Sequence, residues 1–231
     1  MKLTIFGANG PTGRLLTARA LAEGHHVTAA TRHPDAFPLR DDRLEITETD
    51  VYDAGAVERA VAGADAVLSS LGVPFTRKPI SVYSTGGGHI VEAMRWHSVK
   101  RLVVVSSSAT EPHHHADGGF MINRVMQPLV TATIGRTTYA DMRRMEALVR
   151  ASDLAWTIVR PSGLFDLPDA TDYRLDENQA PGVFTARADL AAAMLAQVDD
   201  DRFLRKHLAV TTTAVRPSLW KLMTQEAFKK D

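Results

Sequence analysis

Three glycines near the start of the chain have the spacing of a phosphate-binding loop. Gly7, Gly10 and Gly13 follow a short apolar run and precede a stretch with helical periodicity. In such a loop the first glycine permits a tight turn, the second lets the backbone approach a pyrophosphate, and the third lets the helix pack against the strand. The N–H groups at the helix N-terminus then face the phosphates. A plain strand-to-helix turn is the alternative to the dinucleotide site that we expect at Gly7, Asn9, Gly10, Pro11, Thr12 and Gly13.

The end of the second apolar run indicates which dinucleotide binds. A site for NAD places Asp or Glu there to accept from the ribose 2′-hydroxyl, whereas a site for NADP needs a cation. The chain has Thr31-Arg32-His33 at this position, and Asp35 lies too far along to replace the missing carboxylate. A guanidinium is planar and always charged, which suits a phosphate. The sequence therefore predicts that Arg32 binds the 2′-phosphate of NADP(H), against the alternative of a solvated surface arginine.

Composition excludes several other kinds of chemistry. The chain has no cysteine, which excludes disulfides, zinc–thiolate sites and thiol nucleophiles. The adjacent histidines His113 to His115 point in different directions on a loop, so we expect no metal site. Lysine and arginine balance aspartate and glutamate at 27 each, which leaves no global field for nucleic acid or an anionic membrane. No apolar run approaches the roughly 18–20 residues of a transmembrane helix; we expect a cytoplasmic protein without a leader sequence, whose partner is a small molecule.

The apolar pattern predicts the elements that position these residues. Short apolar runs alternate with stretches of helical periodicity, which is the pattern of βαβ units and a parallel sheet. The expected strands are Leu3–Phe6, His26–Thr31, Leu44–Thr47, Ala66–Ser69, Leu102–Ser106, Trp156–Val159 and His207–Thr211. The expected helices are Thr12–Glu23, Ala54–Ala62, Thr85–His97, Tyr139–Ala151 and Arg187–Val198. Asp53 and Thr185 are expected N-caps, and Gly24 is expected to end the first helix.

The order of these elements predicts an α/β fold with one domain over residues 1–231. Strands and helices alternate as in a Rossmann-type doubly wound parallel sheet, and no repeat or linker divides the chain. Two segments, residues 109–138 and 162–185, are much longer than ordinary loops of such folds. Both leave the carboxyl edge of the sheet, so we expect them to form a small substrate-binding region there. The apolar spacing over Trp220–Phe228 predicts packing rather than ligand binding.

Four further motifs make the whole chain resemble a known family. They are Thr49-Asp50-Val51, Val67–Gly72, Arg101–Ser108 and Trp156–Pro161. Together with the glycines, they resemble the atypical short-chain dehydrogenases/reductases. The chain is most similar to the NAD(P)H-binding, NmrA-like group that includes biliverdin and flavin reductases. The resemblance implies a nicotinamide cofactor whose adenine is flanked by Asp50 and Val51.

The resemblance also implies a set of residues around the nicotinamide and its ribose. This set is Ser70, Leu71, Gly72, Ser106, Ser107, Ser108, Arg160 and Pro161. The first three would border the ribose, the serines would lie beside the nicotinamide, and the last two would line its far side. Plain alternatives exist, with Asp50 as the cap of a turn and the serines as partners of backbone groups at a strand end.

The usual catalytic set of the resembled superfamily is only partly present. That set is Ser or Thr after the fifth strand and Tyr-x-x-x-Lys on the next helix, with tyrosine as the general acid. The chain has Tyr139-Ala-Asp-Met-Arg143, so arginine stands in place of lysine. Arg143 keeps a positive charge near the tyrosine and the cofactor, but its planar fork is not equivalent to lysine. We take Ser108 as the donor to substrate and Tyr139 as a candidate acid, with packing at the helix start as the alternative for Tyr139.

Three functions fit these residues. The first is NADPH-dependent reduction of a small planar acceptor such as a flavin, tetrapyrrole or quinone, which needs a stacking surface and little protonation. The second is a redox-sensing regulator that binds NADP(H) without catalysis, as some NmrA-like proteins do. The third is an epimerase or dehydratase that uses the cofactor transiently. The compact length favours the first, the missing lysine favours the second over a carbonyl reductase, and both monomer and dimer are compatible with the sequence.

Overall fold

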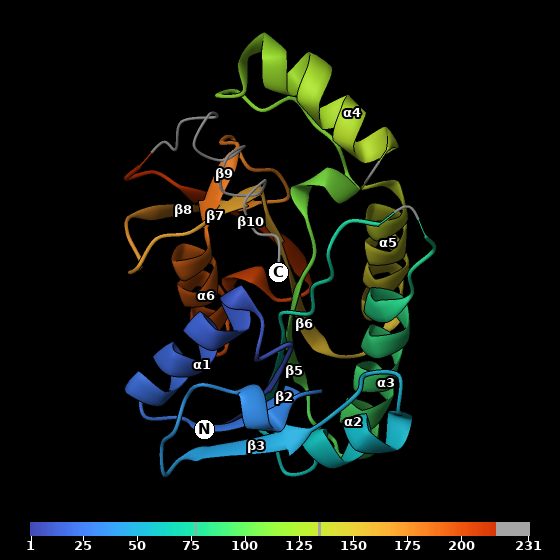
Figure 1. Cartoon of the computed structure of the whole chain (residues 1–231), viewed down its shortest axis with the longest axis vertical. Coiled ribbons are helices and arrows are strands. Elements are labelled where there is room, and N and C mark those ends of the chain that lie inside the picture. Colours follow the sequence, from blue (N-terminus) through green and yellow to red (C-terminus); the bar gives the residue numbers. More distant parts are fainter. Residues whose placement is uncertain (77, 134, 216–231) are drawn as a thin grey trace.

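A central sheet of eight strands organises the molecule (Figure 1). The computed structural model describes residues 1–76, 78–133 and 135–215. The strands run in the order β3-β2-β1-β4-β5-β6-β10-β8, and every neighbouring pair is parallel except β10 with β8. In this order the chain starts near the middle of the sheet and winds outward in both directions. The predicted α/β fold of the Rossmann type is confirmed.

The elements agree closely with those expected for the sheet and its covering helices. The main strands are β1 (Lys2–Phe6), β2 (His26–Thr31), β3 (Leu44–Glu48), β4 (Ala66–Ser69), β5 (Arg101–Val105), β6 (Ala155–Pro161), β8 (Tyr173–Glu177) and β10 (Lys206–Thr212). A separate two-stranded parallel sheet is formed by β7 (Gly163–Phe165) and β9 (Phe184–Ala186). The helices are α1 (Pro11–Ala22), α2 (Ala54–Val61), α3 (Val82–Trp96), α4 (Gln127–Ala132), α5 (Arg136–Ala151) and α6 (Arg187–Ala196).

Helices cover both faces of the central sheet. α1 and α6 pack together on one face, and α2, α3 and α5 pack on the other. The side chains of β5 alternate between the two apolar cores. Leu102 and Val104 lie with Ile90 of α3, whereas Val103 lies with Leu190 of α6. Burial on both faces explains why the sequence of β5 is apolar without interruption.

Two of the three predicted helix ends are confirmed. The carboxylate of Asp53 accepts from two backbone N–H groups in the first turn of α2. Gly24 follows α1 with a φ of +87°, the left-handed conformation that ends many helices. Thr185 was predicted wrongly, because α6 has no side-chain cap. The hydroxyl of Thr185 donates to the carbonyl oxygen of Val210 and accepts from the N–H of Ser162, so it joins β9 to β10 and β6.

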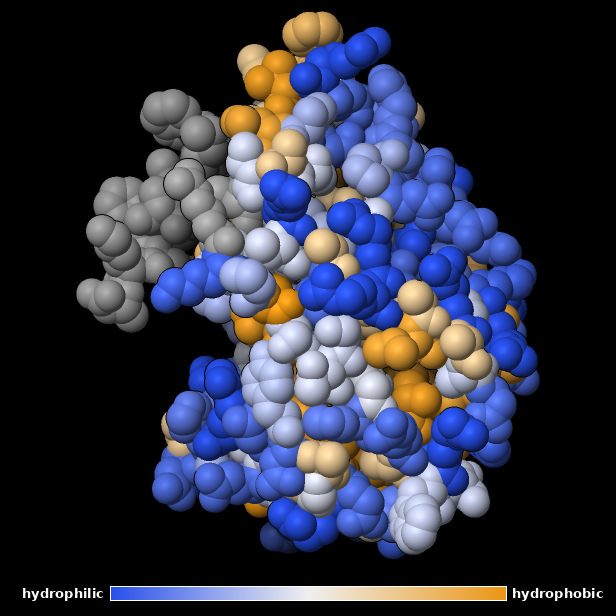
Figure 2. Space-filling view, turned by 90° about the vertical axis from the view of Figure 1, so that its right-hand side faces the viewer, coloured by the Kyte–Doolittle hydropathy of each residue, from blue (hydrophilic) through white to orange (hydrophobic). Residues whose placement is uncertain are grey.

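The two long segments contain more regular structure than the sequence predicted. Residues 109–138 include a π-helical turn (Met121–Met126) that continues into α4, and this unit projects beyond the sheet edge (Figure 1). Its apolar side chains are exposed at the tip, with Phe120 at 77% and Leu129 at 57% (Figure 2). Residues 162–185 include β7 and β8. The sequence of β8 alternates apolar and charged residues, as edge strands with one solvated face do.

A contact between two helices sets where α3 begins. The carboxylate of Asp141 in α5 is fully buried and accepts from the backbone N–H groups of Tyr83 at 2.9 Å and Ser84 at 3.3 Å. It therefore caps α3, which starts at Val82 instead of the expected Thr85.

Among the described residues, no helix combines the length and the apolar character needed to cross a bilayer. The packing predicted for residues 220–228 lies outside the described residues.

Candidate functional site

The glycine loop, residues 7–13, leads from β1 to α1 at the carboxyl edge of the sheet. Gly7 has a φ of +71°, a conformation that residues with a Cβ rarely adopt. A Cβ on Gly13 would lie 2.1 Å from the carbonyl oxygen of Gly7, so only glycine fits where α1 begins. A Cβ on Gly10 would meet only that same oxygen, at 3.2 Å, with open space beyond it. Gly10 is therefore the position at which a pyrophosphate can approach the backbone.

The first turn of α1 presents unused backbone donors. Gly10 is the N-cap and Pro11 the first helical residue, and among the described residues no side chain caps this turn or adds an acidic group to it. The amide oxygen of Asn9 accepts from Nε of Arg14 at 2.9 Å, and Thr12 is half-buried. The free N–H groups and the positive end of the helix dipole suit a bound anion.

The residues after β4 lie against the glycine loop. The hydroxyl of Ser70 is 3.1 Å from the carbonyl oxygen of Phe6 and 3.3 Å from that of Gly7. Its backbone N–H also donates to Phe6, at 2.9 Å. Leu71 is half-buried and Gly72 is exposed. The structure thus brings residues 70–72 to the loop, where the Ser70 hydroxyl fixes the backbone, while their contact with a ribose stays a prediction.

Arg32 and the Asp50–Val51 pair follow the neighbouring strands β2 and β3. Arg32 is exposed directly after β2. Asp50 is also exposed and accepts from the backbone N–H of Tyr52 at 3.0 Å, so it caps a turn. Val51 is buried, and its carbonyl oxygen lies 2.9 Å from Nδ1 of His89. An exposed cation therefore stands at the strand end that distinguishes NADP from NAD.

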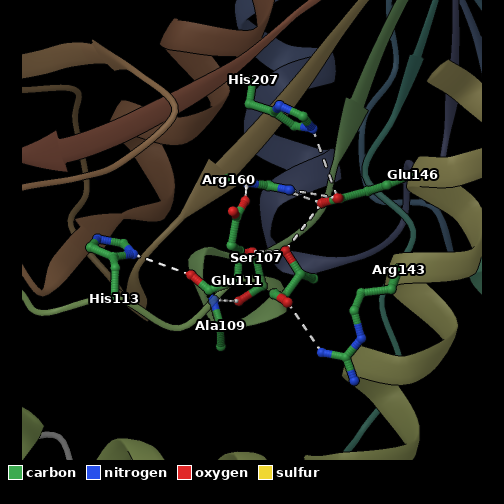
Figure 3. Close-up of polar contacts among 9 residues, drawn as sticks. Ser107, Ala109, Glu111, His113, Arg143, Glu146, Arg160 and His207 are labelled. Atoms are coloured by element: carbon green, nitrogen blue, oxygen red, sulfur yellow. Dashed lines mark hydrogen bonds and ion pairs between the residues drawn. The ribbon is translucent and has the colours of Figure 1, made fainter.

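The serine turn, residues 106–110, follows β5 and carries the three candidate serines, of which Figure 3 shows Ser107. Ser106 and Ser108 are buried. The hydroxyl oxygen of Ser107 accepts from the N–H of Ala109 at 3.2 Å, and this hydroxyl lies near enough to the phenol of Tyr139 to lower its pKa. Ser107 is therefore the serine of this turn that influences Tyr139, while Ser108 as the donor to substrate stays a prediction.

Tyr139 lies in the first turn of α5 with 8% of its surface exposed. Its ring meets that of Phe75 edge to face, with 5.9 Å between the centroids. Gly135 makes room for it, because a Cβ there would lie 2.4 Å from the Tyr139 ring. Burial raises the pKa of Tyr139, and the nearby hydroxyl of Ser107 offsets part of that rise. At neutral pH the phenol is therefore protonated and able to donate.

Arg143, one turn after Tyr139, directs its head group to the serine turn (Figure 3). Its Nη1 donates to the carbonyl oxygen of Thr110 at 3.1 Å, and the residue is exposed. Arg143 thus holds the backbone of the turn. Its contact with a cofactor stays a prediction.

Behind the serine turn lies a buried ion pair that the sequence analysis missed (Figure 3). Arg160 of β6 and Glu146 of α5 are 4% and 2% exposed, and two hydrogen bonds of 3.0 and 2.7 Å join them. Nη1 of Arg160 also donates to Glu111 at 2.7 Å. Burial raises the pKa of Glu146, but the hydrogen bonds of Arg160 outweigh it and hold the pKa below its usual value. The guanidinium of Arg160 thus bonds two carboxylates, those of Glu146 and Glu111. The next residue, Pro161, is buried.

The histidines of residues 113–115 join the two long segments. The rings of His113 and His115 lie 4.3 Å apart, and both face the carbonyl oxygen of Ala180, at 3.0 and 3.2 Å. Burial lowers the pKa of His115. Within residues 1–76, 78–133 and 135–215, no three His, Asp or Glu side chains gather as metal ligands. These contacts join the segment of residues 109–138 to the segment of residues 162–185, while a substrate-binding region formed by the two stays a prediction.

A comparison with protein-family models shows which family the chain belongs to. The model of the NAD(P)H-binding family matches residues 7–201, beginning at the glycine loop. The chain belongs to the NAD(P)H-binding family. Its cofactor is a nicotinamide dinucleotide, and its fold is of the Rossmann type.

Curated relatives of this NAD(P)H-binding protein match over different lengths. An uncharacterised sugar epimerase of Bacillus subtilis is 26% identical over 210 residues, which is 87% of this chain and 89% of the relative. An uncharacterised protein of Mycobacterium tuberculosis is 37% identical over 108 residues, which is 46% of this chain and 12% of the relative. The chain therefore matches only a small part of the longer mycobacterial protein.

Solved structures share the fold over nearly the whole chain. A short-chain dehydrogenase/reductase of Veillonella parvula in complex with NADP has a TM-score of 0.77 and 22% identity, covering 94% of this chain and 99% of that one. An anaerobilin reductase of Escherichia coli has a TM-score of 0.73 and 21% identity, covering 94% and 100%. At these identities the likeness shows the fold.

The residues present fit a dinucleotide. The open space at Gly10 and the uncapped turn of α1 would hold the pyrophosphate, and the residues after β4 and β5 would hold the nicotinamide half. A bound nicotinamide supplies hydride chemistry. The chain's own contribution is a protonated phenol, Tyr139, with the hydroxyl of Ser107 near it.

Proposed function

We propose that this NAD(P)H-binding protein is an NADPH-dependent reductase of a small planar acceptor. The observation that carries the proposal is the buried phenol of Tyr139, whose pKa the nearby hydroxyl of Ser107 lowers and whose ring meets the ring of Phe75. Ser107 follows β5, at the same edge of the sheet where the glycine loop follows β1. Reduction of an acceptor needs a hydride and a proton, and the protonated phenol of Tyr139 in the first turn of α5 can donate the proton.

Arg32 supports NADPH as the cofactor. It is exposed at the end of β2, and β2 pairs with β1, the strand that leads into the glycine loop. A guanidinium there meets a 2′-phosphate with charge-assisted hydrogen bonds. A carboxylate, which would favour NAD, is absent from Thr31, Arg32 and His33.

Phe75 supports a planar acceptor. Its ring contacts Tyr139 edge to face and is 48% exposed, so an aromatic face remains open beside the proton donor. Aromatic rings of flavins, quinones and tetrapyrroles stack on such faces. A solved structure of the same fold is named as an anaerobilin reductase of Escherichia coli, which supports a reductase.

An epimerase is the second candidate. The relative named as a sugar epimerase in Bacillus subtilis matches along almost the full length of both chains, unlike the mycobacterial relative. A protonated tyrosine with a serine nearby also suits proton movement at a sugar hydroxyl.

One assay separates these candidates. Oxidation of NADPH is followed with a panel of flavins, quinones, biliverdin and simple carbonyl compounds, and nucleotide sugars are examined for conversion in the same buffer. We expect oxidation with at least one planar acceptor, and slower oxidation with NADH. Conversion of a sugar without net NADPH oxidation would replace the reductase with the epimerase. Tight cofactor binding without turnover of any compound would favour a regulator that senses the cofactor.

A further inference from the structure

Arg14 is a cation at the end of α1 where a helix disfavours one. It lies in the first turn of α1, which begins at Pro11 and contains no acidic residue. The N-terminal end of a helix carries about half a positive charge, so acidic side chains stabilise it and basic side chains destabilise it. The sequence therefore places Arg14 where it lowers the stability of the helix. An anion bound at this end would reverse the sign of that effect.

The side chain of Arg14 is held against the glycine loop. Its Nε donates to the amide oxygen of Asn9 at 2.9 Å, which leaves the N–H groups of Nη1 and Nη2 for another acceptor. Side chains of a helix point back toward its N-terminus, so this contact follows the direction of α1. Asn9 precedes Gly10, where the backbone is open to a pyrophosphate. The guanidinium thus stands beside the place where the pyrophosphate is expected.

Arg19, further along α1, shows what an ordinary surface arginine of this helix does. It forms an ion pair with Glu23 at 2.9 Å, which is a pairing of neighbours on the helix surface. Arg14 is exposed as well, but no carboxylate in the described part of the chain forms an ion pair with it. Its positive charge is therefore available to an anion from outside the chain.

Two sets of donors meet at the opening beside Gly10. The first turn of α1 presents the backbone N–H groups of Thr12 and Gly13, since Pro11 has none. The N–H of Arg14 is used, because it donates to the carbonyl oxygen of Gly10 at 2.9 Å. A helix end supplies about half a positive charge, whereas a pyrophosphate in a dinucleotide carries one negative charge on each phosphate. The guanidinium adds a full charge and donors in a fixed plane, which suits this group.

We propose that Arg14 is a further cofactor-binding residue, whose Nη1 and Nη2 donate to the pyrophosphate of the dinucleotide beside Gly10. Asn9 orients the guanidinium through the bond to Nε. The inference requires the dinucleotide site but not the proposed reductase. Arg14 and Arg32 then have different tasks. Arg14 binds a group that NADPH and NADH share, whereas Arg32 binds the 2′-phosphate that only NADPH has.

The variants Arg14→Gln and Arg14→Lys test this contact. Glutamine removes the charge but keeps an amide that can donate to Asn9, whereas lysine keeps the charge but not the planar fork. Arg19→Gln is the matched control, because it removes the same charge from the same helix. Calorimetric titration with NADPH and with NADH gives both affinities for each full-length variant.

Arg14→Gln should weaken NADPH and NADH by the same factor, about tenfold, because both contain the pyrophosphate. The ratio of the two affinities should therefore stay that of the original protein, whereas Arg32→Ala should lose it. Arg14→Lys should retain part of the affinity, and Arg19→Gln all of it. Unchanged affinities for both cofactors in Arg14→Gln would overturn the inference. A loss confined to NADPH would overturn the pyrophosphate assignment and indicate a contact with the 2′-phosphate.

Thermal unfolding separates a binding role from a structural one. Without cofactor, the midpoint of Arg14→Gln should equal or slightly exceed that of the original protein, because repulsion with the helix end is relieved. The rise in midpoint at a given NADPH concentration should be smaller in Arg14→Gln. A midpoint of the free protein lowered by several degrees would contradict the inference and indicate that Arg14 supports the loop. If both cofactors bind as expected and no acceptor is reduced, only the proposed reductase fails.

Discussion

The glycine loop and the serine turn leave the same edge of the sheet, one after β1 and the other after β5. The conformation of the glycine loop is fixed by steric exclusion of side chains. A Cβ on Gly13 would lie 2.1 Å from a backbone oxygen, and Gly7 has a positive φ. The serine turn is fixed by attachment, through hydrogen bonds to α5 and to the ion pair that Arg160 forms with Glu146.

This difference predicts that cofactor binding and turnover depend on different residues. A loop fixed by steric exclusion keeps its conformation as long as its glycines are present. A turn fixed by side chains from distant segments changes its position when those side chains change. We therefore expect substitutions in the glycine loop to abolish cofactor binding, and substitutions around the serine turn to change turnover.

The largest effect is expected within the glycine loop. Gly10→Val should abolish binding of NADPH and leave the protein folded, because the added side chain occupies the open space at the backbone. Gly13→Val should disrupt the loop itself, since its Cβ meets backbone atoms. Calorimetric titration measures binding, and circular dichroism measures folding.

The control for these variants is Gly88→Ala in α3, where a Cβ makes an ordinary contact of 3.9 Å with Leu148. It should bind NADPH normally. Gly10→Val that is folded and still binds NADPH with unchanged affinity would show that the pyrophosphate lies elsewhere.

An intermediate effect is expected from breaking the buried ion pair. Glu146→Gln should lower the free energy of unfolding by about 3–5 kcal/mol at neutral pH, because Arg160 loses its buried carboxylate partner and keeps only the exposed Glu111. The pKa of Glu146 is lowered in the folded protein. The stability that ionised Glu146 contributes is therefore fully present above the ordinary carboxyl pKa. It is lost as the pH falls through the lower pKa that Glu146 has in the folded protein.

Urea unfolding, measured from neutral pH to about pH 3, tests this sign. The difference in free energy of unfolding between the original protein and Glu146→Gln should shrink toward acid pH. A difference that grows as the pH falls would contradict the lowered pKa.

The smallest effects are expected at Tyr139 and Ser107. With a planar acceptor, Tyr139→Phe should lower turnover less than about tenfold, below the roughly 10²–10⁴-fold typical of general acids, since such acceptors need little protonation. Ser107→Ala should change turnover by a similar amount, because the hydroxyl of Ser107 influences the phenol of Tyr139. Steady-state kinetics with NADPH checks both.

Ser108→Ala is the informative companion of these variants. The sequence analysis placed the substrate donor at Ser108, which is 8% exposed in the structure. A larger loss from Ser108→Ala than from Ser107→Ala would support Ser108 as the donor to substrate. Loss of all turnover in Tyr139→Phe, with a carbonyl compound as the best substrate, would replace the planar acceptor by ordinary carbonyl reduction.

The sequence was sufficient for features whose causes are local. The glycine spacing, the apolar runs of the parallel strands and the caps at Asp53 and Gly24 all act within a few residues, so the pattern itself carries the physical reason. The Rossmann order then follows from the alternation of strands and helices.

The features that were missed depend on distant partners. Asp141 caps α3 from 58 residues away, and Thr185 bonds Val210 instead of capping α6. A signal for the buried ion pair was present, because Glu146 interrupts an apolar stripe of α5 that contains Met142, Met145 and Val149. A glutamate inside such a stripe indicates a buried partner, but the spacing alone does not name Arg160.

The central claim is that this family member holds NADPH at the glycine loop and recognises it through Arg32. Calorimetric titration of the original protein with NADPH and NADH is the most direct test, with Arg32→Ala beside it and the exposed Arg19→Ala of α1 as control. We expect NADPH to bind about 10- to 100-fold more tightly than NADH, a preference lost in Arg32→Ala and kept in Arg19→Ala. Equal affinities of the original protein for the two cofactors would contradict the account.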